Sequence, residues 1–327
     1  MSLEREHVPR PEVGRSVSVV IPAYQPGTLL LRALESVQAQ TRPPEEVIVV
    51  DDGCTDGSVD RARAAFPAAR FIALDANLGV SVARNRGVEA AQGALIAFLD
   101  ADDTWREDKL LHQLQAMERA GAEVGLTGFF DLRTSRRQWG TRSSSGPLDA
   151  LLTAGVPMMM SSLVVDRALL LDAGGFDPSL PRGEDMECLY RLALGGGIAC
   201  FEPQPLASYH HDNGASLTQG ARRILRYSEL EQRLRAAAEV LGGSRLEGLL
   251  RAATRHFAER AASDLLRGIA QDDWLDDLFA HGSEVALRGL GRARRLPGPL
   301  RRIRLRHYVL TGRARSQRRF FSRGGGR

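Results

Sequence analysis

Acidic side chains follow two apolar segments of the chain, at the points where strands would end. These acids are Asp51, Asp52, Asp100, Asp102 and Asp103. In an open parallel sheet, ligands bind outside the carboxyl ends of the strands. Like charges packed there raise one another's pKa values unless a cation compensates, and oxygen ligands favour Mg²⁺ or Mn²⁺ over zinc. The placement therefore indicates a divalent-cation site, with capping of the following helix as the alternative.

Other phosphate-binding and metal-binding patterns are absent from the sequence. The chain has no G-x-x-x-x-G-K-[ST] motif, and Pro22-Ala23-Tyr24-Gln25-Pro26-Gly27 stands where a G-x-G-x-x-G motif would follow the first strand. These absences argue against P-loop and dinucleotide-binding proteins. The three cysteines, Cys54, Cys188 and Cys200, are far apart and odd in number, which argues against a disulfide framework or a zinc site.

Short β-branched runs alternate with helical stretches in the first third of the chain. The expected strands cover residues 17–21, 47–50, 71–74 and 94–99, and the expected helices cover 28–40, 58–66 and 80–91. Alternation of this kind predicts parallel strands joined by right-handed crossover helices. The acids therefore fall at one edge of a parallel sheet, where several of them can reach the same ligand.

The rest of the chain keeps an α/β pattern and then becomes helical. We expect a helix at 107–120, strands at 123–130 and 161–165, a polar loop or flap at 133–146, and a helix at 184–194. From residue 221 to about 290 the periodicity is helical without strand signals. These patterns predict four parts, which are a flexible leader at 1–15, an α/β domain at 16–220, a helical extension at 221–290 and a basic tail at 291–327.

Several segments in register resemble the family 2 glycosyltransferases, which use nucleotide sugars and have the GT-A fold. The matching segments are Val17–Tyr24, Val49–Ser58, Asn77–Asn85, Phe98–Asp103 and Gly174–Asp177, followed by Gly183–Asp185 and Leu189–Leu192. They span about residues 16–218, and Cys54 stands where the family usually has serine. The resemblance implies a Rossmann-like GT-A fold, with a mixed, mostly parallel sheet flanked by helices.

The resemblance also implies which residues bind the donor. The nucleotide-binding set would be Pro22, Ala23, Tyr24, Asp52, Arg84 and Asp100. In this set, Asp52 would accept a hydrogen bond from the base, and Asp100 would contact the ribose or the sugar. Arg84 would approach the nucleotide, and a structural ion pair is the alternative. Asp102 would hold Mg²⁺ or Mn²⁺ on the diphosphate, with His211, or His210 in its place, as a further metal or phosphate contact.

The acceptor side of the reaction needs a base for the attacking hydroxyl. The resemblance implies Asp185 as that base and Glu184 as an acceptor or orienting contact, whereas their place at a helix start also fits capping acids. Attack from the face opposite the leaving group implies inversion at the anomeric carbon. The expected activity is transfer of a sugar from a UDP-, GDP- or dTDP-linked donor to a saccharide or lipid-linked acceptor, in cell-surface polysaccharide biosynthesis. A catalytically degenerate nucleotide-sugar-binding protein is the alternative function.

Charge and hydropathy bear on where the protein acts. No run reaches the roughly 20 apolar residues of a membrane-spanning helix, and the N-terminal residues do not resemble a signal peptide, so we expect a cytoplasmic protein. Residues 288–327 hold 14 arginines and no acid, which leaves 30 basic and 40 acidic residues in the rest of the chain. This tail favours peripheral attachment to an anionic membrane, at its inner face, over nucleic-acid binding.

Overall fold

The structure, a computed structural model, describes residues 15–132, 136–138, 143–154, 156, 158–180, 183–210, 226–241, 243–254 and 257. Residues 1–14, His211 and the basic tail lie outside these ranges. The chain divides into two compact units. The first contains Met1–Gly146, Pro157–Cys188 and Gly197–Arg223, and the second contains Pro147–Val156, Leu189–Gly196 and Ile224–Arg327.

The first unit is an α/β structure built on one sheet. The strands of the sheet are β1 (Val17–Ala23), β2 (Glu46–Asp51), β3 (Arg70–Ala73), β4 (Leu95–Phe98), β5 (Thr104–Trp105), β6 (Val124–Asp131), β7 (Arg136–Gln138), β8 (Ser144–Pro147), β9 (Val164–Asp166) and β10 (Ile198–Tyr209). The helices of this unit are α1 (Leu29–Gln38), α2 (Ser58–Ala65), α3 (Val80–Ala90), α4 (Lys109–Ala120), the 3-10 helix η1 (Met160–Ser162) and α6 (Arg167–Asp172).

The second unit is helical in the part that the structure describes. It contains α5 (Leu148–Ala154), α9 (Tyr227–Leu241) and a helical segment at 246–254. Helix α7 (Glu184–Leu194) begins in the first unit and ends in the second. Within the described residues, no helix is both long and apolar enough to cross a membrane.

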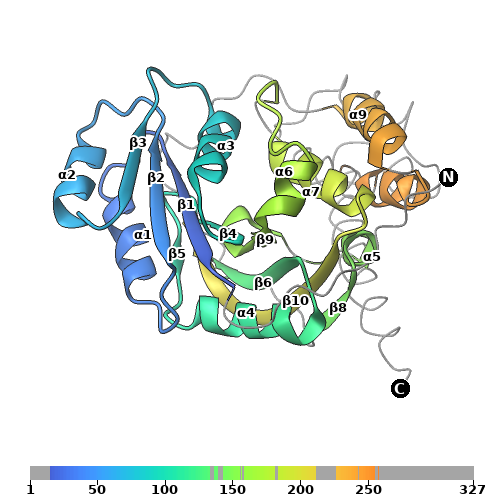
Figure 1. Ribbon diagram of the computed structural model, residues 1–327, viewed down its shortest axis with the longest axis horizontal. Coiled ribbons are helices and arrows are strands. Elements are labelled where there is room, and N and C mark those ends of the chain that lie inside the picture. The colour runs from blue at the N-terminus through green and yellow to red at the C-terminus, as the bar shows by residue number, and fades with distance from the viewer. Residues whose placement is uncertain are drawn as a thin grey trace, which may run out of the picture. The chain divides into compact units, whose positions relative to one another are not determined.

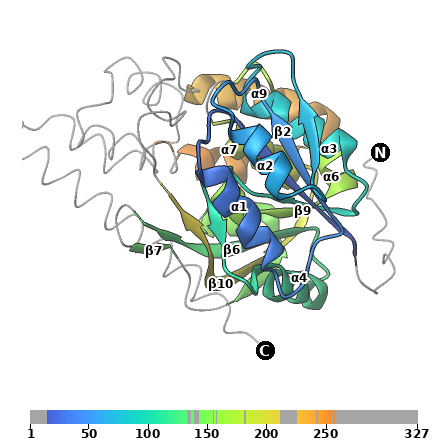
Figure 2. The ribbon, with the colours of Figure 1, turned by 90° about the vertical axis from the view of Figure 1, so that its left-hand side faces the viewer.

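The strands of the sheet lie in the order β3-β2-β1-β4-β9-β6-β10-β5. β1 is parallel to β2 and β4, β2 to β3, and β6 to β10, whereas β9 is antiparallel to β4 and β6. The mixed sheet that the sequence predicts is therefore confirmed. The chain reverses its direction across the sheet between β3 and β4, so α1 and α2 cover one face of β1–β3 and α3 covers the other (Figure 1, Figure 2). This reversal makes the carboxyl ends of β1 and β4 the topological switch point, where open α/β sheets bind ligands.

Apolar spacing explains why the first strands and helices form. Every residue of β1 and β4 is buried, as expected for parallel strands covered on both faces. The buried residues of α1 have the i, i+3, i+4, i+7 spacing of an amphipathic helix, and they are Leu30, Ala33, Leu34 and Val37. Gly87 of α3 packs so closely on β1 that an added Cβ would lie 2.3 Å from Val20 Cγ1.

The structure corrects several expected element boundaries. Helix α1 covers Leu29–Gln38, which is shorter than the expected 28–40 at both ends, and the Thr28 side chain makes no capping hydrogen bond. The stretch 133–146, expected as a loop, contains β7 and most of β8. Ser161 and Ser162, expected in a strand, form η1, and β9 begins at Val164. Their hydroxyls bond to the Asp103 carboxylate and the Met159 carbonyl, and such side-chain bonds compete with extended structure.

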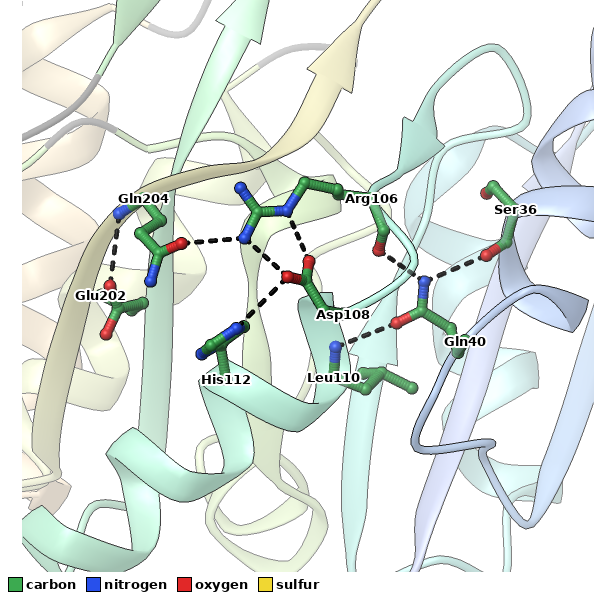
Figure 3. A network of polar contacts seen from close by, with 8 residues as sticks. All are labelled: Ser36, Gln40, Arg106, Asp108, Leu110, His112, Glu202 and Gln204. Atoms are coloured by element: carbon green, nitrogen blue, oxygen red, sulfur yellow. Dashed lines mark hydrogen bonds and ion pairs between the residues drawn. The ribbon is translucent and has the colours of Figure 1, made fainter.

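A polar network fixes the end of α1 to the segment between β5 and α4 (Figure 3). The buried Gln40 side chain donates to the carbonyls of Ser36, at 3.0 Å, and Arg106, at 2.7 Å, and it accepts from the Leu110 amide at 3.0 Å. At the surface, Arg106 also donates to Gln204 at 2.8 Å. Because β5 comes directly after the acidic segment 100–103, Gln40 anchors the chain where that segment ends.

Replacing Gln40 with glutamate should therefore lower stability. The substitution keeps the shape but removes both donors, and it places a carboxylate against two carbonyl oxygens. We expect a loss of roughly 2–4 kcal/mol in the free energy of unfolding, measured by urea denaturation. Gln204→Glu is the matched control, because Gln204 lies at the surface beside Arg106. Equal stability of the two variants would contradict this role for Gln40.

Candidate active site

The loops after β1, β2 and β3 are joined around Asp52. Its buried carboxylate accepts the backbone N–H groups of Leu78, at 2.7 Å, and Gly79, at 3.0 Å, and its own amide donates to the Ala23 carbonyl at 2.8 Å. Gly53 (φ 76°) lies so close to the loop after β3 that an added Cβ would be 2.8 Å from Asn77 N. Asp52 thus organises this edge of the sheet, and its bond to a nucleotide base stays a prediction.

Residues 22–24, expected in the nucleotide-binding set, differ in how accessible they are. Pro22 and Ala23 belong to β1, where they are buried and lie opposite Val50 and Asp51. Tyr24 is the first residue beyond the strand, and it is 42% exposed. Of the three residues, Tyr24 therefore has the side chain that is open to a ligand.

The acidic segment after β4 concentrates negative charge at the switch point. Asp103 is fully buried and accepts hydrogen bonds from Ser161 Oγ at 2.5 Å and from the His210 amide at 3.0 Å. Burial raises the pKa of Asp103 well above its ordinary value, and the charges of Asp100 and Asp102 add to the rise. Burial, with help from these acids, also raises the pKa of Tyr209 to about 12. A bound cation would relieve this repulsion.

These residues fit a divalent cation whose ligands come partly from the protein and partly from a diphosphate. The donor groups are carboxylate oxygens, which suit Mg²⁺ or Mn²⁺. Among the described residues, no three His, Cys, Asp or Glu side chains are grouped so that they could hold a metal alone. Asp100 is paired with Arg84, and Asp103 is occupied by Ser161 and His210. A cation held at Asp102 would thus need further ligands, which phosphate oxygens supply.

The structure places only one of the two candidate histidines. His211 lies outside the described residues. His210 follows β10, and its amide donates to Asp103, so the chain brings it to the acidic segment. Its Nε2 lies 3.3 Å from Arg32 Nη2 of α1. The contact of His210 or His211 with a metal or phosphate stays a prediction.

Arg84 is buried on α3 between two acids from distant parts of the chain. Its Nη2 lies 2.9 Å from Asp100 Oδ1, and its Nη1 lies 2.8 Å from Glu184 Oε1. Burial disfavours the charge of Arg84, but the attraction of Asp100 and Glu184 outweighs burial and raises its pKa. Arg84 thus makes the structural ion pair that the sequence left as its alternative role. This ion pair joins the end of β4 to the start of α7.

A hydrogen-bonded clamp beside Arg84 holds the segment before α7. Asn85 donates to the Phe176 carbonyl at 2.7 Å and accepts from the Phe176 amide at 2.8 Å. Gly175 (φ 65°) leaves no room for a Cβ, which would lie 2.6 Å from Asn85 Oδ1. The Phe176 ring packs edge-on against Phe98 of β4, with 5.3 Å between the ring centres. Arg84 and Asn85 together therefore fix the Gly-Gly-Phe segment to the sheet.

The two acids at the start of α7 have different surroundings. Glu184 is buried against Arg84. Burial raises the pKa of Glu184, the charge of Asp185 raises it further, and the charge of Arg84 lowers it. Asp185 is partly exposed, and its Oδ1 accepts the Met186 amide at 2.7 Å. A capping side chain accepts the amide two or three residues further on, so this bond to the next residue does not make Asp185 a helix cap. Asp185 is consequently the acid with the greater access to an acceptor.

Comparisons with known proteins identify the family of this chain. A family model described as "Glycosyl transferase family 2" matches residues 18–160. The succinoglycan biosynthesis protein ExoO of Rhizobium meliloti is 31% identical over 250 residues, which are 71% of this chain and 70% of that relative. The chain belongs to glycosyltransferase family 2. The matched residues 18–160 contain the acids after β2 and β4, and they end before α7.

One further relative by sequence and one solved structure are also similar to this family 2 chain. The putative teichuronic acid biosynthesis glycosyltransferase TuaG of Bacillus subtilis is 38% identical over 116 residues, 35% of this chain and 46% of that protein. The crystal structure of S. aureus TarS 1-349 in complex with UDP-GlcNAc is 17% identical, with a TM-score of 0.67 over 94% of this chain and 92% of that one. At this identity the likeness shows the fold, which confirms the predicted GT-A architecture.

The sequence alone gives no role to two residues that build this site. Ser161 bonds Asp103, and its Oγ also accepts the Asp100 amide at 3.0 Å. Asn85 clamps Phe176. Two adjacent serines within a long uncharged run were the available signal for Ser161. For Asn85 the signal was its place next to Arg84, but its partner lies 91 residues away.

Replacing Arg84 with methionine should destabilise the enzyme in a pH-dependent way. The change leaves Glu184 buried without its cation, which costs about 3–5 kcal/mol. Without Arg84 the pKa of Glu184 in the folded protein rises further above its pKa in the unfolded chain. The folded state then disfavours the ionised carboxylate, so stability falls as the pH rises above the pKa of the unfolded chain. The loss relative to the parent protein should therefore grow between about pH 5 and about pH 8. Urea denaturation at several pH values measures it.

Two further variants test the cause of this loss. Adding Glu184→Gln to Arg84→Met should recover part of the stability at high pH, because the uncompensated charge is gone. Arg86→Met is the control, since Arg86 is exposed on the same helix and its ion pair with Glu89, at 3.2 Å, is a surface contact. A pH-independent loss in Arg84→Met would show that lost packing, not charge, is responsible.

Proposed function

We propose that this protein is an inverting, metal-dependent glycosyltransferase that moves a sugar from a nucleoside-diphosphate sugar to the hydroxyl of a saccharide or lipid-linked acceptor. The observation that carries the proposal is the Arg84 ion pair, because it joins Asp100, expected on the donor side, to Glu184, next to the expected base. Both halves of the chemistry thereby meet at the switch point of the sheet.

The comparisons support the class of donor and of product. TarS, which shares the fold, was crystallised with UDP-GlcNAc and with UDP. Two relatives are named for succinoglycan and teichuronic acid biosynthesis. We therefore propose a nucleotide-sugar donor and a role in polysaccharide biosynthesis for this chain as well.

The chain's own residues have distinct tasks in the proposed reaction. When bound, Mg²⁺ or Mn²⁺ would neutralise the charge that grows on the departing diphosphate. Asp102 would hold that ion, and Asp52 and Tyr24 would bind the nucleoside. Asp185 would take the proton of the acceptor hydroxyl as its oxygen attacks the anomeric carbon and the sugar–phosphate bond breaks. Attack opposite the leaving group inverts the configuration of that carbon.

The proposed metal role predicts that a nucleoside diphosphate binds much more tightly with a divalent ion than without one. Affinity for UDP, GDP or dTDP, measured by calorimetry, should fall at least about tenfold when EDTA replaces Mn²⁺, because the diphosphate would lose its counter-charge beside three carboxylates. Asp102→Asn should lose most of this dependence on metal. Equal affinity in both buffers would remove the metal from the proposal.

Replacing Asp185 with asparagine separates a base from a helix cap. Asparagine can still accept a hydrogen bond at the helix start but cannot take the proton. The transfer rate should therefore fall about 10²–10⁴-fold, while nucleotide affinity and melting temperature stay close to those of the parent. Asp60→Asn, in the first turn of α2, is the matched control. Near-normal transfer with reduced stability in Asp185→Asn would mean that Asp185 only caps α7. Nucleotide binding without transfer by the parent protein would favour the alternative function, a catalytically degenerate nucleotide-sugar-binding protein.

A further inference from the structure

Gln25, just beyond β1, has a backbone conformation that is uncommon for its residue type. Its φ is 49°, and among the described residues no other non-glycine has a positive φ. Asparagine and aspartate enter this left-handed region several times more often than most residues, and glycine enters it freely. Such strain persists only where the surroundings hold it, and it is concentrated at functional sites.

The side chain of Gln25 holds the loop after β2. Its Oε1 accepts the amides of Thr55 and Asp56, both at 3.1 Å, and its Nε2 donates to Thr55 Oγ1 at 2.8 Å. Thr55 and Asp56 are exposed, and Gln25 is only partly buried. Hydrogen bonds at such a surface contribute little net stability, so this arrangement is poorly explained as a folding device.

Backbone groups at and beside Gln25 also bond to side chains of the loop after β2. The Gln25 amide donates to Cys54 Sγ at 3.3 Å, and that thiol lies 3.4 Å from the Ala23 carbonyl. The Gly27 amide donates to Asp56 Oδ2 at 2.9 Å. Since Asp52 ties the loop after β2 to the loop after β3, Gln25 is one link of a chain of contacts across three neighbouring strands.

We infer that Gln25 is a positioning residue for the nucleoside end of the donor. By spanning the loops after β1 and β2, it holds the exposed Tyr24 ring and the loop that contains Asp52 in their binding arrangement before the nucleotide arrives. A site organised in advance loses less entropy on binding and so binds more tightly. This inference rests on the proposed function, because it assigns the nucleoside to Tyr24 and Asp52.

Two substitutions separate the side-chain contacts from the backbone conformation. Gln25→Asn keeps a carboxamide in a residue that tolerates the left-handed region, but it is one methylene too short to repeat the bonds to Thr55 and Asp56. Gln25→Gly removes the side chain and the strain together, and it remains informative if the asparagine variant folds poorly. Gln204→Asn is the matched control, because it shortens a glutamine of β10 whose Oε1 accepts from Arg106 at 2.8 Å (Figure 3).

The test compares two probes that share the diphosphate but differ in the nucleoside. With Mn²⁺ present, calorimetry measures the affinity of the full-length variants for UDP or GDP and for inorganic pyrophosphate. Both Gln25 variants should bind the preferred nucleoside diphosphate about tenfold more weakly and bind pyrophosphate as the parent does. With a working donor, KM should rise by a similar factor while kcat changes little. Melting temperatures should match those of the parent and of Gln204→Asn.

The outcomes distinguish this inference from the function on which it rests. If the parent binds no nucleoside diphosphate, the proposed function fails and the inference fails with it. If the parent binds one and the Gln25 variants bind it equally well, only the inference fails. Parallel losses of nucleotide affinity, pyrophosphate affinity and melting temperature would overturn it too, because they would show a general structural role for Gln25.

Discussion

The ion pair of Arg84 with Asp100 and Glu184 is the interaction on which the site depends. Taking a guanidinium out of water costs free energy, and two carboxylates at hydrogen-bond distance offset this cost. These acids lie 84 residues apart in the sequence, at the end of β4 and the start of α7. Removing Arg84 leaves the buried Glu184 without its counter-charge, whereas removing either acid leaves Arg84 with one carboxylate in place of two. The position of α7 relative to the acidic segment is therefore tied to the charge of one side chain.

The remaining loops at this edge are held by side chains that bond to backbone groups of other loops. Asp52 takes two amides beyond β3, Gln25 takes two amides beyond β2, and Asn85 takes both polar backbone groups of Phe176. A backbone amide or carbonyl is present whatever side chain its residue has, so these bonds do not depend on the side chains of the loop residues that they hold. The site can thus be rigid although its loops contain few buried apolar residues, whereas the strands below it are held by the apolar core.

The sequence predicts the strands, the helices and the family more completely than the site. Apolar periodicity is local, so β1, α1 and α7 are found close to their observed bounds. The sequence also places the acids at strand ends. It does not show that Arg84 bridges Asp100 and Glu184, or that Ser161 turns out of a strand to bond Asp103, because those facts depend on contacts between residues 16 to 100 positions apart. Gln25 was visible in its motif, but its left-handed φ was not.

The surroundings of Glu184 and Asp185 favour different chemical tasks for these neighbours. A carboxylate bound by a buried guanidinium keeps a fixed orientation, and a proton added to it would weaken the ion pair that orders the site. Glu184 is therefore suited to orient groups, and its burial leaves it little access to an acceptor hydroxyl. Asp185 follows it on the same helix, where consecutive side chains point about 100° apart, and it is more exposed. The ion pair that restrains Glu184 thus favours Asp185 for the proposed proton transfer, and the positive charge of Arg84 stays close enough to interact with the Asp185 carboxylate.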